Sequence, residues 1–192
     1  MTNALVFIVA TLVDLYVIAF LLRFVLQWRR ADFRNPLSQF IVAATNPLVM
    51  PLRRFVPSIA GFDTTCILIP LLIKGIEYTA MTALLCTVAA GPVELVSMTM
   101  LSVIRTFLNL YFFLILVWVI LSWVAQGYNP MTALIGQLVE PVLAPLRRYI
   151  PVIGGFDISP IFAIIGIQAL TILIPKAQLF TSLGCSSGVM YL

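Results

Sequence analysis

The sequence contains no histidine and few charged residues. Only 9% of its 192 residues are charged, whereas 62% are hydrophobic, and the mean hydropathy is +1.12. Soluble domains carry about 25% charged residues, so a water-soluble chain of this length could not hide so much apolar surface. The absence of histidine removes the commonest general base and the commonest metal ligand. The composition therefore indicates a protein whose solvent is a lipid bilayer.

Cysteine is also scarce, and its three copies are Cys66, Cys86 and Cys185. Their odd number and wide spacing indicate neither a disulfide framework nor a metal site. We expect Cys66 and Cys86 to act as small apolar residues inside membrane helices. The sequence contains no GxSxG, no HExxH and no Gly-rich phosphate loop. We therefore predict a protein that is not an enzyme and that uses no cofactor, metal or nucleic acid.

Four long apolar stretches predict an all-α integral membrane protein with four transmembrane helices. A transmembrane helix needs about 20 mainly apolar residues, with a range of about 17–25. The first three stretches fit easily and the fourth is short. The first contains Asp14 and has no basic residue before Arg23, which argues against a cleaved signal peptide. The stretches cover about 4–28, 65–89, 100–124 and 158–174.

The two segments between paired spans read as copies of each other. Residues 35–63 and 129–157, aligned at a constant offset of 94, share 13 of 29 positions. The first and third apolar stretches match at an offset of 95, one residue more than the loops, which pairs Tyr16 with Tyr111. An internal duplication with two spans in each copy predicts parallel tandem repeats, related by an axis along the membrane normal. The predicted units are repeat 1 at 1–95 with its loop at 29–64, repeat 2 at 96–176 with its loop at 125–157, and a C-terminal tail at 177–192.

Basic residues are concentrated in the two repeated loops, which hold eight of the eleven lysines and arginines when Arg23, near the end of the first apolar stretch, is counted with the first loop. Cytoplasmic loops of membrane proteins carry an excess of such residues. We therefore predict that both loops face the cytoplasm and that both termini face away from it.

Each repeated loop reads as two short helical segments that lie in the membrane interface or re-enter the membrane. Asn35-Pro36 and Asn129-Pro130 predict helix starts, because asparagine caps a helix and proline is tolerated at its first position. A second start is expected in each loop at Asn46-Pro47 and at Glu140-Pro141.

The loops end in arginine pairs, Arg53-Arg54 and Arg147-Arg148, each followed by a proline three residues later. One interpretation is that these arginines meet anionic lipid headgroups or a protein partner. The alternative is that they only anchor the topology. Asp63 and Asp157 follow a Gly-Phe pair just before a span, and we expect them to cap the helices that begin there.

A small set of polar residues lies inside the predicted spans. Lys74 and Glu77 are three residues apart and share a helix face, while Gln168 occupies the repeat position of Lys74. Intramembrane charges cost about 2.5–3.5 kcal/mol and normally face the bundle interior. The set forms either an ion or proton path, or a structural Lys74–Glu77 pair with hydrogen bonds between helices from the others. Its members are Asp14, Lys74, Glu77, Asn109 and Gln168.

The duplicated loop motifs resemble those of the YggT family, whose relatives in cyanobacteria and plastids are called YlmG proteins. The similar segments are 35–57 and 129–151, together with LYVIAFLLRFVLQW at 15–28 and DFRNP at 32–36. The resemblance extends over nearly the whole chain to about Pro175. It implies a multi-pass protein of the bacterial inner membrane without defined catalytic residues, linked to osmotic or membrane stress, ion uptake or division-related membrane organisation.

Two functions follow as hypotheses. The first is a non-enzymatic scaffold that modulates membrane partners through its Pro/Arg loops. The alternative is a small ion transporter or channel component that uses the intramembrane polar set. The expected partners are the lipid bilayer with its anionic headgroups, and other membrane proteins or further copies of the chain.

Overall fold

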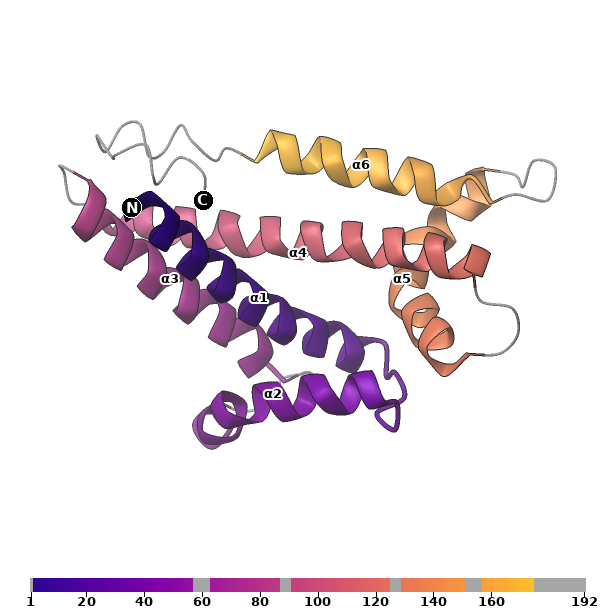
Figure 1. Cartoon of the computed structure of the whole chain (residues 1–192), viewed down its shortest axis with the longest axis horizontal. Coiled ribbons are helices and arrows are strands. Elements are labelled where there is room, and N and C mark those ends of the chain that lie inside the picture. The colour runs from indigo at the N-terminus through magenta and orange to yellow at the C-terminus, as the bar shows by residue number, and fades with distance from the viewer. Residues whose placement is uncertain (1, 57–62, 87–90, 125–128, 151–156, 175–192) are drawn as a thin grey trace.

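The computed structural model describes residues 2–56, 63–86, 91–124, 129–150 and 157–174 (Figure 1). Within these residues the chain forms six α-helices, and a long helix, a loop helix and a further apolar helix occur in that order twice. The helices are α1 (Thr2–Trp28), α2 (Pro36–Leu52), α3 (Thr65–Leu85), α4 (Pro92–Val124), α5 (Pro130–Tyr149) and α6 (Ser159–Leu173).

Three helices, α1, α3 and α4, are long and apolar enough to cross a membrane. At 1.5 Å per residue, their 27, 21 and 33 residues measure about 40, 31 and 50 Å, against a hydrocarbon core of about 30 Å. Helix α6 is apolar but has 15 residues, about 22 Å. The fourth span therefore stays a prediction, since residues 175–192 lie outside the described part of the chain.

Helix α4 begins at Pro92, so the predicted start near residue 100 is wrong. The Glu94 carboxylate accepts a hydrogen bond from the Gly91 amide at 2.9 Å, and an acidic residue in the first turn complements the helix dipole. These contacts extend the helix by two turns. Arg105 consequently lies about 20 Å from the start of α4.

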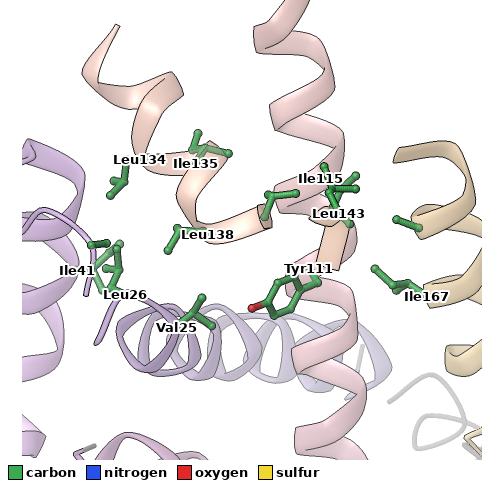
Figure 2. Close-up of a cluster of buried hydrophobic side chains, with 13 residues drawn as sticks. Val25, Leu26, Ile41, Tyr111, Ile115, Leu134, Ile135, Leu138, Leu143 and Ile167 are labelled. Atoms are coloured by element: carbon green, nitrogen blue, oxygen red, sulfur yellow. The ribbon is translucent and has the colours of Figure 1, made fainter. Parts of the chain in front are cut away.

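The prediction of two short helices in each loop is also wrong, because α2 and α5 are each one continuous helix. They contain internal prolines at Pro47 and Pro51, and at Pro141 and Pro145. Each internal proline removes only one backbone hydrogen bond. Both prolines of α2 are exposed, so the carbonyl groups that lose this bond can be solvated outside the helix bundle. Packing of the buried face keeps each helix continuous. Helix α5 bends between Leu134 and Leu143 (Figure 2).

The two halves of the chain use the same packing scheme. Helices α1 and α3 pack together with α2 against them, and α4 and α6 pack together with α5 against them. The halves join where α3 and α1 contact α4. The start of α1 and the end of α3 lie together at one end of the molecule, whereas α2 and α5 lie away from it (Figure 1).

The largest buried cluster connects both loop helices to α1, α4 and α6 (Figure 2). Its side chains are aliphatic apart from Tyr111, which packs edge-on against Phe107 at 5.0 Å. This core fixes α2 and α5 relative to each other. Its labelled members are Val25, Leu26, Ile41, Tyr111, Ile115, Leu134, Ile135, Leu138, Leu143 and Ile167.

Candidate functional site

The two loop helices begin with the same capping interaction. Asn35 Oδ1 accepts a hydrogen bond from the Leu37 amide at 3.0 Å, and Asn129 Oδ1 accepts one from the Met131 amide at 2.9 Å. The predicted caps are therefore confirmed, with a proline in the first turn of each helix. Asn35 is buried and its amide also donates to the Pro130 carbonyl at 3.1 Å. The starts of the two loop helices are thus tied together.

Each loop helix is fastened at its other end by an ion pair between equivalent residues. Arg53 Nε lies 3.5 Å from Asp63 Oδ2, and Arg147 Nε lies 2.8 Å from Asp157 Oδ2. We call these two pairs the Arg–Asp clasps. Their geometry ties the end of α2 to the start of α3, and the end of α5 to the start of α6.

Both clasp aspartates also cap the following helix, as predicted. Asp63 Oδ1 accepts from the Thr65 amide at 3.3 Å and from the Thr65 hydroxyl, and Asp157 Oδ1 accepts from the Ser159 amide at 2.9 Å. Each aspartate lies one residue before the N-cap position. A carboxylate there satisfies amide groups that the first helical turn leaves unpaired.

The second clasp, Arg147–Asp157, has more interaction partners than the first. Arg147 Nη1 also lies 3.0 Å from Glu140 Oε2, and its guanidinium stacks over the Trp118 ring at 5.3 Å. Partial burial alone would raise the pKa of Asp157, but the hydrogen bonds from Ser159 and Arg147 outweigh it and hold that pKa below its ordinary value. The clasp is therefore charged at neutral pH.

The second arginine of each pair does not take part in an Arg–Asp clasp. Arg54 and Arg148 are exposed, and each is followed by an exposed aromatic residue, Phe55 at 85% and Tyr149 at 86%. Within the described residues neither arginine forms a salt bridge. We call Arg54-Phe55 and Arg148-Tyr149 the Arg–aromatic tips. Arginine beside an aromatic ring is the composition of membrane-interface anchors and of protein-binding hot spots.

Inside the bundle, Lys74 joins α3 to α1. Its ammonium lies 2.8 Å from Asp14 Oδ1 and 2.7 Å from Glu77 Oε2. Lys74 and Glu77 are buried, whereas the side chain of Asp14 is 44% exposed. Lys74 and Glu77 therefore form an ion pair on α3, with Asp14 of α1 as a third member. We call these three residues the intramembrane triad.

The other two polar residues do not join the triad. Asn109 is half-buried on α4, and Gln168 is exposed on α6. The expectation that Gln168 faces the bundle interior is wrong for the single chain. The reason is packing: Gly75, beside Lys74, faces Thr99 of α4, whereas Gln168 and its neighbour Ala169 are exposed on α6.

Sequence reasoning missed the role of Arg23, which it treated only as a loop charge. Arg23 is buried near the end of α1, and its Nη1 donates to Thr45 Oγ1 at 2.7 Å and to Asn46 Oδ1 at 2.9 Å. These bonds attach the middle of α2 to α1. The signal was an arginine five residues before the end of an apolar helix, with a Thr-Asn pair in the following loop.

The two cysteines expected inside helices differ from each other. Cys66 is free and buried in the first turn of α3, as predicted. Cys86, at the C-cap of α3, is disulfide-bonded, so its predicted role as a free apolar residue is wrong. Cys86 lies at the opposite end of α3 from the Arg–Asp clasp.

Comparison with known proteins gives a consistent result. The family model described as CCB3/YggT matches residues 2–84 and again residues 97–178. The chain is 42% identical to an uncharacterised protein of Pseudomonas aeruginosa over 91% of this chain and 89% of that protein. It is 36% identical to the uncharacterised protein YggT of Escherichia coli K12, over 85% of each.

A plant protein is similar over a shorter region. The YlmG homolog protein 2, chloroplastic, of Arabidopsis thaliana is 34% identical over 65 residues, which is 34% of this chain and 26% of that protein. No solved structure matches the chain.

Proposed function

The chain belongs to the CCB3/YggT family, and from this premise we propose a non-enzymatic scaffold of the bacterial inner membrane, with α2 and α5 as its cytoplasmic interaction layer. The single observation that carries the proposal is the pair of Arg–aromatic tips. In both loops one arginine closes an Arg–Asp clasp, and the next arginine and its aromatic neighbour are exposed. Such tips fit anionic lipid headgroups on the cytoplasmic surface, and partners that lie there.

The proposed arrangement is four membrane helices in two parallel tandem repeats. Identical caps and clasps at an offset of 94, and the double family match, support the duplication. Seven of the eleven basic residues lie in the loops at 29–64 and 125–157, which supports a cytoplasmic position for both. The disulfide at Cys86, at the other end of α3, supports a periplasmic position for that end, because disulfides persist in oxidising compartments.

The osmotic-stress or division-linked role implied by the family resemblance fits such a scaffold. A rigid layer that holds two positive, aromatic points at fixed positions recruits anionic lipid and organises proteins at the membrane surface. This role requires no catalytic group, and the Arg–Asp clasps supply the rigidity.

The test measures lipid preference. The purified protein is placed in nanodiscs with phosphatidylglycerol and phosphatidylcholine, and the lipids that it retains are counted by native mass spectrometry. The wild type should retain phosphatidylglycerol preferentially, and Arg54→Glu with Arg148→Glu should abolish the preference. The matched control is Arg30→Glu with Arg34→Glu, which reverses two exposed loop charges outside the tips and should keep most of the preference.

The alternative is a small ion transporter or channel component that uses the intramembrane triad. The observation that favours it is Asp14, a half-exposed carboxylate in contact with a buried ammonium. In this case Lys74→Leu with Glu77→Leu would stop ion movement and leave lipid preference intact. Gradient-dependent ion flux through the wild type in liposomes, lost in that variant, would reject the scaffold in favour of the transporter.

A further inference from the structure

The two halves of the molecule meet where α3 packs against α4. Gly75 of α3 faces Thr99 of α4 in this contact, and an added Cβ would lie 3.8 Å from Thr99 Oγ1. One turn further along, Tyr78 shares a side-chain hydrogen bond with Ser102. Small residues let membrane helices approach closely, and polar pairs then form across the contact. We call this contact the α3–α4 junction.

The duplication places α6 where α3 lies and α1 where α4 lies. The α3–α4 junction should therefore have a counterpart between α6 and α1. Among the described helices, however, α6 packs mainly against α4 and α5 and forms no extensive contact with α1. Figure 1 shows α6 on the side of α4 away from α1 and α3.

The face of α6 that would form this counterpart junction is exposed. At the offset of 94, Lys74 corresponds to Gln168, Gly75 to Ala169 and Tyr78 to Ile172. Lys74 and Tyr78 are buried, whereas all three α6 residues are exposed. Gly166, nearby on α6, also has open space where a side chain would project.

The α1 side is uncovered in the same way. At the offset of 95 that pairs Tyr16 with Tyr111, the α4 residues of the junction correspond to residues near the start of α1. Thr99, Val103 and Thr106 are buried, whereas every counterpart on α1 is exposed. The counterparts of Thr99, Ser102, Val103 and Thr106 are Ala4, Phe7, Ile8 and Thr11.

We propose that a second copy of this chain covers these faces, its α1 packing on α6 as α4 packs on α3. Lipid chains can cover the apolar residues of α6, but they offer no partner to the amide of Gln168 in the middle of the helix. A second copy continues an interface that the chain already forms once. In a symmetric dimer each α6 meets the α1 of the other copy, so both open faces close together.

This inference rests on the tandem-repeat arrangement proposed above, but not on the scaffold role. It is tested by disulfide crosslinking between two differently tagged copies expressed together, one with Ala4→Cys and the other with Ala169→Cys. A disulfide needs Cα atoms about 4.4–6.8 Å apart, so it reports direct packing. We expect a dimer that carries both tags and disappears on reduction.

The matched control replaces Ala4→Cys by Val9→Cys, which is also exposed on α1 but projects about 140° around the helix. It should crosslink weakly. Gly75→Cys with Thr99→Cys in one chain should give an intrachain crosslink and shows that the variants fold. Equal crosslinking at Val9 and Ala4, or none at Ala4 while the intrachain control forms, overturns the proposal.

A second measurement separates packing between copies from closure within one chain. Ala169→Phe should weaken dimerisation in nanodiscs about tenfold, because overpacking a close contact costs about 1–3 kcal/mol. Leu170→Phe, on the neighbouring exposed position, should leave it unchanged. An intrachain crosslink in a single copy with Ala4→Cys and Ala169→Cys would overturn the proposal. Loss of the crosslink with an intact lipid preference would reject the dimer and leave the scaffold standing.

Discussion

Lys74 holds two carboxylates in the interior of the helix bundle, and its removal gives the sharpest stability prediction. Its ammonium lies 2.8 Å from Asp14 and 2.7 Å from Glu77. Lys74→Leu deletes the cation and leaves both carboxylates unpaired. Removing one member of a buried ion pair costs about 3–5 kcal/mol, because the remaining charge stays desolvated. Glu77 is buried and neither of its oxygens has another hydrogen-bond partner, so we expect the upper half of that range.

The other members of the series should be milder. Glu77→Leu leaves Lys74 paired with Asp14 and relieves the desolvation of one carboxylate, so its cost should stay below about 2 kcal/mol. Lys74→Leu with Glu77→Leu leaves only Asp14 unpaired, and that side chain is 44% exposed. The double variant should therefore be more stable than Lys74→Leu alone, with a coupling of about 2 kcal/mol or more.

The assay is reversible unfolding in mixed micelles or bicelles, followed by helical circular dichroism as the fraction of denaturing detergent rises. Ile76→Leu is the control and should change little, because Ile76 lies between Lys74 and Glu77 in the sequence but its side chain is 71% exposed. The reasoning is refuted if Lys74→Leu is no more damaging than Glu77→Leu. It is also refuted if the costs of the two single variants simply add in the double variant.

Three further predictions concern the loop helices. Asp157→Asn should lower stability at neutral pH but not in acid. Because folding lowers the pKa of Asp157, the carboxylate stabilises the fold fully above its ordinary pKa near 4 and loses this effect as pH falls through the lowered pKa. In a plot of the thermal-unfolding midpoint against pH, the decrease in acid should therefore be smaller in the variant. Arg23→Met should cost about 1–3 kcal/mol, since it removes two charge-assisted bonds to α2, and protease cleavage within α2 should become faster. Asn35→Ala and Asn129→Ala should each lose a helix cap worth about 1 kcal/mol of stability. Asn35→Ala should cost more, because Asn35 also donates a hydrogen bond to α5. Equal unfolding midpoints for the two variants would contradict this.

Much of the fold could be predicted because lipid imposes simple rules on sequence. Apolar runs long enough to cross a bilayer located α1, α3 and most of α4, and Asn-Pro pairs located the starts of α2 and α5. Errors occurred where tertiary contacts decide. The internal prolines suggested breaks, but the packed faces of α2 and α5 keep each helix continuous. The first turns of α4 were missed because they carry Glu94, Ser97 and Thr99, and apolar content alone indicated a later start.

The candidate site was predictable only in part. Spacing alone placed Lys74 and Glu77 on one face, but Asp14 joins them from another helix, which only the packing of α1 on α3 reveals. The arginine pairs were evident from the repeat, yet the sequence could not show that the two arginines of each pair have different neighbours. That difference depends on the position of the clasp aspartate ten residues later, after a segment whose course the sequence does not specify.

The proposed topology requires both Pro/Arg loops to lie on one side of the membrane. Single cysteines at Arg54→Cys, Arg148→Cys and Gly91→Cys, in a chain whose native cysteines are replaced, can be probed with a membrane-impermeant maleimide on intact cells and on inverted vesicles. The account predicts labelling of positions 54 and 148 only from the cytoplasmic face, and of position 91 only from the periplasmic face. Labelling of 54 and 148 from opposite faces would contradict it.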